Sequence, residues 1–233
     1  MSRGIPAKSF EREDGPAGDL GRKPTLERLR RDVKRRKVLA AMLAPPCKTW
    51  GTAICRSYVL RTRHEPWGKA DVHLQVPPAM IFKLNDGNQA MKITLQLIGD
   101  LLAAGISWAF EHPQNSYVFH TAEMQKILCD SRVHTFVLDQ CAYGARWRKS
   151  TRVVFGNICV QDTMSMRRCC CGQHGICSFT GRKHVVLEGR SSKGRNLTEE
   201  AAAYPPRLYH ALAKALTATA MAQLYNFLGT VAR

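Results

Sequence analysis

Two side chains in this sequence stand where a nucleophile and an acid would be placed. Cys47 follows Pro45 and Pro46 at the end of an apolar run, and Glu111 follows a second apolar run and precedes Pro113. Proline stiffens each turn, and such fixed placement favours catalysis. A cysteine thiolate is a strong nucleophile, and burial helps a carboxyl to keep its proton. The pair predicts nucleophilic attack assisted by proton transfer.

Each residue also has a simpler interpretation. Cysteine is a common core residue, and a single glutamate at a turn usually lies on the surface. The pair is more informative, because one helical segment separates the two apolar runs. A right-handed crossover would bring the ends of two such strands side by side.

The apolar runs around these residues predict the elements that would position them. Residues 38–44 and 106–110 lack alternation, which is typical of strands buried on both faces of a parallel sheet. Further strands are predicted at 133–138 and 151–155, and helices at 22–37, 88–104, 121–128 and 208–228. Residues 48–87 show no period and are expected to form a functional or mobile loop. The pattern predicts an α/β fold with its site at the carboxyl ends of the strands.

The charge of the chain favours a polyanionic partner. There are 35 Lys and Arg residues against 18 Asp and Glu, giving a net charge of +17, and such a surplus is typical of proteins that bind nucleic acid. The segment 22–37 holds nine basic and two acidic residues, and is either a solvated helix face or a face that contacts phosphates. We expect DNA as the partner, contacted through Lys48, Arg56, Arg61, Arg63, Arg146, Arg148 and Lys149.

The cysteines point to a second kind of site. The polar N-terminus has no signal-peptide pattern, and no apolar run is long enough to span a membrane. We therefore expect an intracellular, nuclear protein whose nine cysteines are free, catalytic or bound to metal. Cys171, His174, Cys177 and His184 are candidate ligands of a structural zinc ion. The alternative is a basic loop without metal.

Three motifs, in order, resemble the cytosine-C5 DNA methyltransferase family. Pro45-Pro46-Cys47 with the Thr-Trp-Gly-Thr-Ala stretch after Lys48 resembles the family's Pro-Cys motif, and Glu111-His112-Pro113 resembles its Glu-Asn-Val or Glu-Asn-Pro motif. The segment 148–153 is similar to its Gln-x-Arg-x-Arg-Val strand. The resemblance implies that Cys47 attacks C6 of a flipped cytosine, that Glu111 protonates N3, and that Arg152 supports both.

The family resemblance also implies a cofactor, S-adenosylmethionine. The family's Phe-x-Gly-x-Gly loop, which binds this methyl donor, has no counterpart in residues 1–37. We expect a Rossmann-like methyltransferase sheet that is incomplete at its N-terminus, with the donor site missing or supplied by an upstream segment or a partner polypeptide. The alternative function is that of a non-catalytic DNA-binding remnant of a mobile element. A Cys/His hydrolase using Cys47 is a third, weaker hypothesis, because no triad motif supports it.

The expected organisation has four parts. Residues 1–21 form a flexible tail, residues 22–160 an α/β core, residues 161–197 a basic Cys/His-rich insert, and residues 198–233 a C-terminal helical segment.

Overall fold

The computed structural model describes residues 6–11, 14–52, 58–158, 167–171, 175–192 and 194–231, with only the backbone of 223–231. The helices are α1 (Lys23–Lys34), α2 (Val72–Gln75), α3 (Pro78–Ala104), α4 (Ala122–Leu128), α5 (Leu197–Glu200) and α6 (Pro206–Val231), with short 3-10 turns η3 (Tyr117–His120) and η4 (Gln140–Tyr143). The strands are β1 (Ala40–Leu43), β2 (Ser107–Pro113), β3 (Val133–Asp139) and β4 (Ser150–Gly156). The α/β class expected from the sequence is confirmed.

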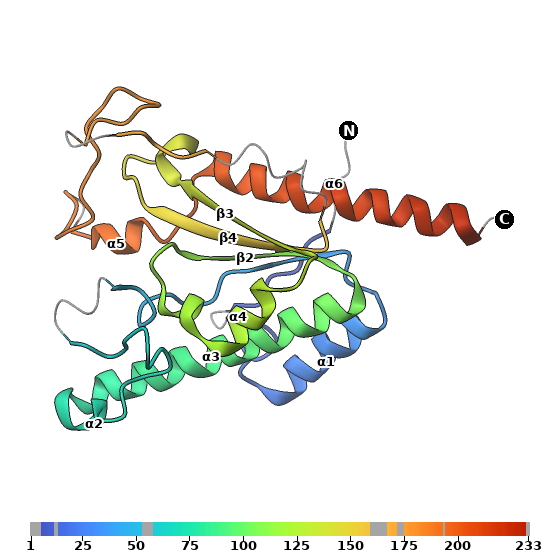
Figure 1. Ribbon diagram of the computed structural model, residues 1–233, viewed down its shortest axis with the longest axis horizontal. Coiled ribbons are helices and arrows are strands. Elements are labelled where there is room, and N and C mark those ends of the chain that lie inside the picture. Colours follow the sequence, from blue (N-terminus) through green and yellow to red (C-terminus); the bar gives the residue numbers. More distant parts are fainter. Residues whose placement is uncertain are drawn as a thin grey trace.

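The four strands form one mixed sheet in the order β1-β2-β4-β3. β1 and β2 are parallel, whereas β4 runs antiparallel to both β2 and β3. Helix α6 lies on one face of this sheet, and α1, α3 and α4 lie on the other (Figure 1). The arrangement is compatible with a Rossmann-like sheet, in which helices cover both faces.

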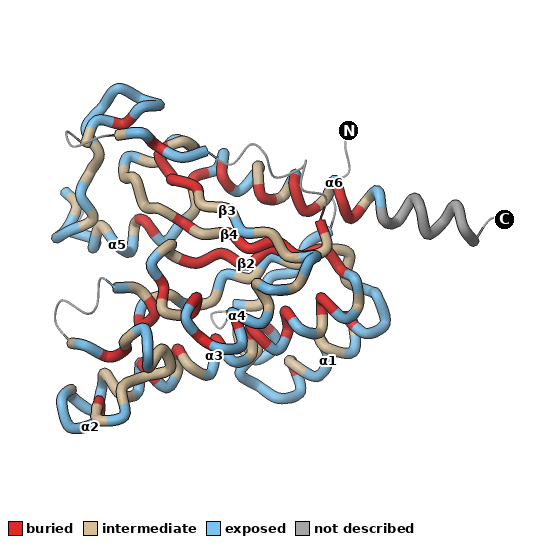
Figure 2. The backbone as a smooth tube through the Cα atoms, viewed as in Figure 1, coloured by how far each residue is buried: buried red, intermediate tan, exposed pale blue. Residues whose placement is uncertain are grey.

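Each face of the sheet has its own hydrophobic core. On the α3 side, Trp108 and Phe110 of β2 pack with Met91 and Ile98 of α3. On the α6 side, Ala109 of β2 packs in one cluster with apolar residues of β4 and the first half of α6. Buried residues therefore line β2, β4 and the sheet-facing part of α6 (Figure 2).

Helix α3 is longer than the sequence predicts. Its C-terminus is the expected one, because Gly105 adopts a left-handed φ of 67° and its N–H donates to the helix. Its first ten residues, and the single turn α2, fall in the segment expected to be a loop. Pro77 and Pro78 start the helix there, since proline fits the first helical turn.

Strand β1 is less buried than its composition predicts. Its residues are half-buried or exposed, and Met42 is 38% exposed. The reason is its position at the edge of the sheet, beyond β2. The central strand β2, by contrast, is buried on both faces.

Candidate active site and metal-binding cluster

Cys47 and Glu111 lie at the same edge of the sheet. β1 and β2 are parallel neighbours, with Leu43 paired to Phe110; Glu111 lies near the C-terminal end of β2, and Cys47 follows the end of β1. Cys47 is half-buried and Glu111 is 7% exposed. The structure thus brings together the two residues that the sequence singles out, and each lies within electrostatic reach of the other.

The turn that carries Cys47 is hydrogen-bonded internally and, through Trp50, to α3. The backbone N–H groups of Trp50 and Gly51 donate to the Cys47 carbonyl at 3.0 and 3.1 Å. Trp50 is fully buried, and its indole N–H donates to the Gly87 carbonyl of α3 at 3.1 Å. These contacts hold the thiol in one place relative to the helix beneath it.

The thiol of Cys47 is not activated in the free protein. Burial raises its pKa, and the charge of Glu111 adds to the rise, whereas the ammonium groups of Lys149 and Lys48 lower it without overcoming burial. Basic neighbours alone would depress the pKa of this thiol, but the net direction in the structure is upward. Full ionisation therefore needs higher pH or a bound ligand whose charge or hydrogen bonds stabilise the anion.

Glu111 is held by a residue from the far end of the chain. The phenol of Tyr204 donates to its Oε2 at 2.5 Å. Burial raises the pKa of Glu111, and the Tyr204 and Lys149 contacts only partly offset that rise. Among the described residues its Oε1 has no hydrogen-bond partner, although the Thr151 hydroxyl, which donates to the Lys149 carbonyl at 3.3 Å, lies near enough to help lower the pKa of the carboxyl. The carboxyl is therefore prepared to give a proton to a ligand and bind it.

Arg152 lies on the opposite face of the sheet from Glu111. Across the strands Val153 pairs with Glu111, and Arg152 pairs with His112. Because side chains alternate along a strand, Arg152 points toward α3, where its guanidinium lies 4.3 Å from the Phe119 ring centroid. The expectation that Arg152 shares the Cys47 and Glu111 pocket is therefore wrong. Lys149 and Tyr204, which the sequence analysis did not assign to that pocket, lie there instead.

The face of the sheet toward α3 also holds a buried imidazole, and a cleft lies near Arg152. His112 is fully buried and stacked on Phe110, and burial lowers its pKa to about 3, so the ring is neutral. Beside it a cleft of about 670 Å³ is lined by Arg61, Arg63, Arg152, Tyr117, Phe119 and His120 among others.

The basic residues expected to contact DNA differ in how far they are exposed. Lys48, Arg63 and Arg146 are exposed, and Arg146 lies 3.7 Å from the Glu200 carboxylate. Arg61 is fully buried and donates to Thr49 and Pro66, so its assignment as a DNA contact is wrong. Arg148 lies 3.4 Å from Asp139, and the Lys149 ammonium donates to the Ala201 carbonyl at 2.7 Å. Arg56 lies outside the described residues.

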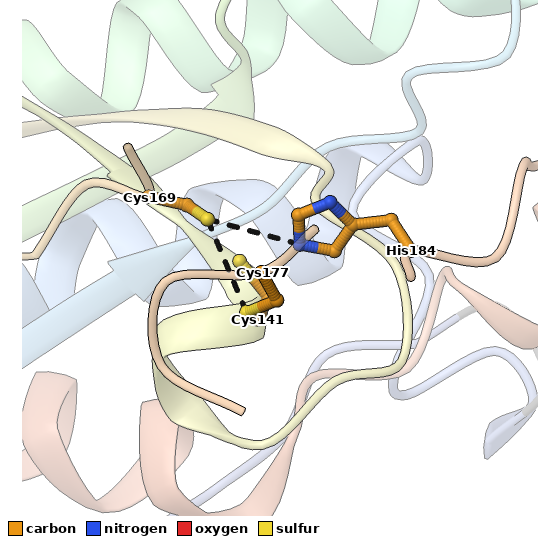
Figure 3. Close-up of side chains that lie close together, drawn as sticks. All are labelled: Cys141, Cys169, Cys177 and His184. Carbon is orange, nitrogen blue, oxygen red and sulfur yellow. Dashed lines mark hydrogen bonds between the residues drawn. The ribbon is translucent and has the colours of Figure 1, made fainter. Parts of the chain in front are cut away.

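A separate cluster of four side chains could hold a metal ion. The ligand atoms of Cys141, Cys169, Cys177 and His184 all lie within 4.8 Å of one another, and the three cysteines are buried (Figure 3). The Cys169 sulfur is 3.9 Å from that of Cys177 and 3.8 Å from Nε2 of His184. Although burial opposes it, hydrogen bonds from Thr180 and its neighbours lower the pKa of Cys177 to about 6, and metals bind the deprotonated thiolate.

Two of the four ligands differ from those that the sequence predicts. Cys177 and His184 are in the cluster, but Cys171 is not among its four ligands. His174 lies outside the described residues. Cys141 comes instead from η4, far away in the sequence, and Cys169 from the start of the same loop. With three consecutive cysteines at 169–171, the sequence does not tell which of them is the ligand. Cys141 lies far from the others in the sequence, so no local spacing identifies it as a ligand.

Comparison of the chain with models of known protein families, with curated proteins and with solved structures finds no match. Among the described residues, none of the helices combines the length and the apolarity that a membrane crossing requires.

Proposed function

We propose that this chain is a cytosine-C5 DNA methyltransferase-like protein that forms a covalent bond to cytosine. The observation that carries the proposal is the pair of Cys47 and Glu111 on adjacent strand ends, with a buried carboxyl of raised pKa beside the thiol. A proton donor and a sulfur nucleophile at the same edge of the sheet match the chemistry of addition to a pyrimidine ring. The three ordered motifs that resemble the family give the proposal its substrate.

The addition step uses only residues of this pocket. The Cys47 thiolate forms a bond to C6 of a cytosine that has left the base stack. The electrons of the C5–C6 double bond shift through the ring as N3 accepts the proton of Glu111. C5 thereby becomes nucleophilic, and the reverse step expels the thiolate and returns the proton. Lys149, whose charge favours the anionic sulfur, assists the attack.

The methyl donor implied by the resemblance does not fit the described residues. The polar helix α1 precedes β1, and the described residues before β1 contain no strand followed by a glycine loop. We therefore assign no residue to S-adenosylmethionine and derive no step through it. In this proposal a partner polypeptide or a further segment supplies the donor site.

The test of the proposal needs no methyl donor. Reversible addition at C6 makes C5 accept a proton from water, so the C5 hydrogen exchanges with solvent. A duplex labelled with tritium at cytosine C5 should release its label in the presence of the protein. Cys47→Ser should abolish the release, because the hydroxyl is a far weaker nucleophile than a thiolate.

The matched control is Cys129→Ser, which changes an exposed cysteine at the end of α4 and should leave exchange unchanged. If the wild-type protein binds the duplex and never releases label, the catalytic proposal is wrong. The non-catalytic DNA-binding remnant of a mobile element would then be the better description.

DNA binding itself is expected to weaken steeply with salt. Exposed Lys48, Arg63 and Arg146 on a chain of charge +17 would displace counterions from phosphates. Arg146→Ala should reduce the slope of log affinity against log salt by about one. Lys214→Ala, on the exposed side of α6, should leave that slope unchanged. Affinity for a duplex measured across a salt series gives both slopes, and a flat wild-type curve would contradict the expectation.

We further propose that zinc is the ion held by the Cys/His cluster. Three sulfur atoms and one imidazole nitrogen are a ligand set that zinc prefers in structural sites. Sulfur ligands about 2.3 Å from a tetrahedral zinc ion lie roughly 3.8 Å from one another. The separation of 3.9 Å between the Cys169 and Cys177 sulfurs is close to that value.

A further inference from the structure

The ligand Cys141 is joined to the turn that carries Lys149. Its neighbour Gln140 donates its backbone N–H to the Arg148 carbonyl at 2.8 Å. The side-chain oxygen of Gln140 accepts from the Trp147 indole at 3.0 Å. Gln140, the residue next to a metal ligand, is therefore hydrogen-bonded to residues 147 and 148.

The other ligands reach the same turn from the insert. Val185, next to His184, donates its backbone N–H to the Arg146 carbonyl at 2.9 Å. The backbone N–H of Cys169 donates to Oδ2 of Asp139 at 2.7 Å, and Oδ1 of Asp139 accepts from the Ser150 hydroxyl. Bonds from the ligand-bearing segments thus hold both the start and the end of the 146–150 segment.

The turn itself needs outside support. Lys149 has a φ of 27°, in the left-handed region that residues with a Cβ rarely adopt. Such a conformation persists only where the surroundings fix it. In this conformation the Lys149 ammonium reaches the Ala201 carbonyl at 2.7 Å and lies within electrostatic reach of Cys47 and Glu111.

Among the described residues of the insert, Cys169 and Cys177 are the only ones that are buried. The buried cluster that it shares with η4 consists of Cys141, Cys169 and Cys177, with Cys171 packed against them. The two large hydrophobic clusters of the sheet contain none of these cysteines. Losing the metal should therefore release the insert and the turn while the sheet stays folded.

We propose that a zinc ion at Cys141, Cys169, Cys177 and His184 is a positioning element that holds the 146–149 turn, so that the Lys149 ammonium acts on Cys47 and Glu111. The inference rests on the proposed function for the role of that pocket, but the metal site and its link to Lys149 can be measured without any reaction on DNA. Lys149 is the positioning residue through which the metal acts.

The first part of the experiment identifies the ligands. Protein purified without chelator should contain about one equivalent of zinc, and its cobalt-substituted form should show the thiolate-to-cobalt absorption of a tetrahedral site. Cys169→Ser should lose that absorption, whereas Cys171→Ser, at the neighbouring cysteine outside the cluster, should keep it. Loss in Cys171→Ser with retention in Cys169→Ser would overturn the ligand set, as would protein that binds neither metal.

The second part measures the link to Cys47. The rate of Cys47 alkylation by iodoacetamide, read by peptide mass spectrometry across a pH series, reports how readily this thiol ionises. Removing zinc from the wild-type protein should lower the rate at pH 7.5 by roughly three- to tenfold, which is a pKa rise of half to one unit. Lys149→Gln with zinc bound should lower it by a similar factor.

Combining zinc removal with Lys149→Gln tests whether the metal acts through Lys149. If the metal acts through Lys149, removing zinc from Lys149→Gln should cause little further loss, because coupled changes are not additive. Full additivity, or no effect of zinc on Cys47, would overturn it. So would loss of near-ultraviolet circular dichroism on chelation, since the metal would then hold the whole fold. If the link is found but labelled cytosine never exchanges, the proposed function fails and this inference stands.

Discussion

Replacing Glu111 with glutamine is expected to slow the exchange of the cytosine C5 hydrogen roughly 10²- to 10⁴-fold, the usual contribution of a general acid. Glutamine keeps the size of the side chain and can still accept the hydrogen bond from Tyr204, but it has no acidic proton for N3. DNA affinity should change little, because the proposal assigns most of it to contacts with phosphates. The measurement is tritium release at saturating protein, with affinity determined separately.

The pH profile gives a sharper test of the same assignment. Burial raises the pKa of both Glu111 and Cys47, and the reactive form has Glu111 protonated and Cys47 ionised. The wild-type rate should therefore level off above the pKa of Glu111 and fall above that of Cys47. In Glu111→Gln it should keep rising until Cys47 is fully ionised. Glu199→Gln, at an exposed glutamate of α5, should keep the wild-type profile, and an unchanged profile in Glu111→Gln would exclude Glu111 as the acid.

Replacing Gly156 with alanine is expected to lower the free energy of unfolding by about 2–3 kcal/mol. A Cβ at Gly156 would lie 2.2–2.4 Å from three atoms of the Trp108 ring. Trp108 is fully buried between β2 and the α3 core, so its ring cannot move aside without disturbing its neighbours. Urea unfolding should show a lower midpoint with little change in slope.

Gly99→Ala provides a control of opposite sign. Gly99 lies on the exposed side of α3, and a Cβ there meets nothing within 4 Å. Alanine should raise the stability by about 0.5–1 kcal/mol, because it is the better helix former. Equal unfolding midpoints for Gly156→Ala and the wild-type protein would mean that the Trp108 ring does not lie against Gly156.

The sequence predicted the two residues of the pocket whose signals are local. Cys47 and Glu111 each follow an apolar run and stand beside proline, and a single intervening helix makes their strands parallel neighbours. Tyr204 has no such signal, because it reaches Glu111 from 93 residues away. Arg152 was misplaced because the motif gives its position along β4 but not its face, and a shift of one residue reverses the face of a strand.

The elements of the fold were predictable where their period is strong. The second half of α3 has a clear apolar stripe, which its first half does not continue. In the first half Phe82 is exposed, and Leu84 is buried in a separate hydrophobic cluster. The apolar run before Cys47 predicted a strand correctly but not its place at the sheet edge. Strand order depends on long-range pairing, as in β4 inserted between β2 and β3, which no local pattern encodes.

The hydrogen bond between Tyr204 and Glu111 has a consequence for biosynthesis. During translation the thiol and the carboxyl leave the ribosome early, and the phenol that closes over the carboxyl follows 93 residues after Glu111. Tyr204 directly precedes α6, whose first half must pack on the sheet to bring it into place. A chain in which α6 has not packed would therefore lack the Tyr204 hydrogen bond, which in the folded protein lowers the pKa of Glu111 against the larger effect of burial. The hydrogen bond to this carboxyl therefore forms only after α6 has packed on the sheet.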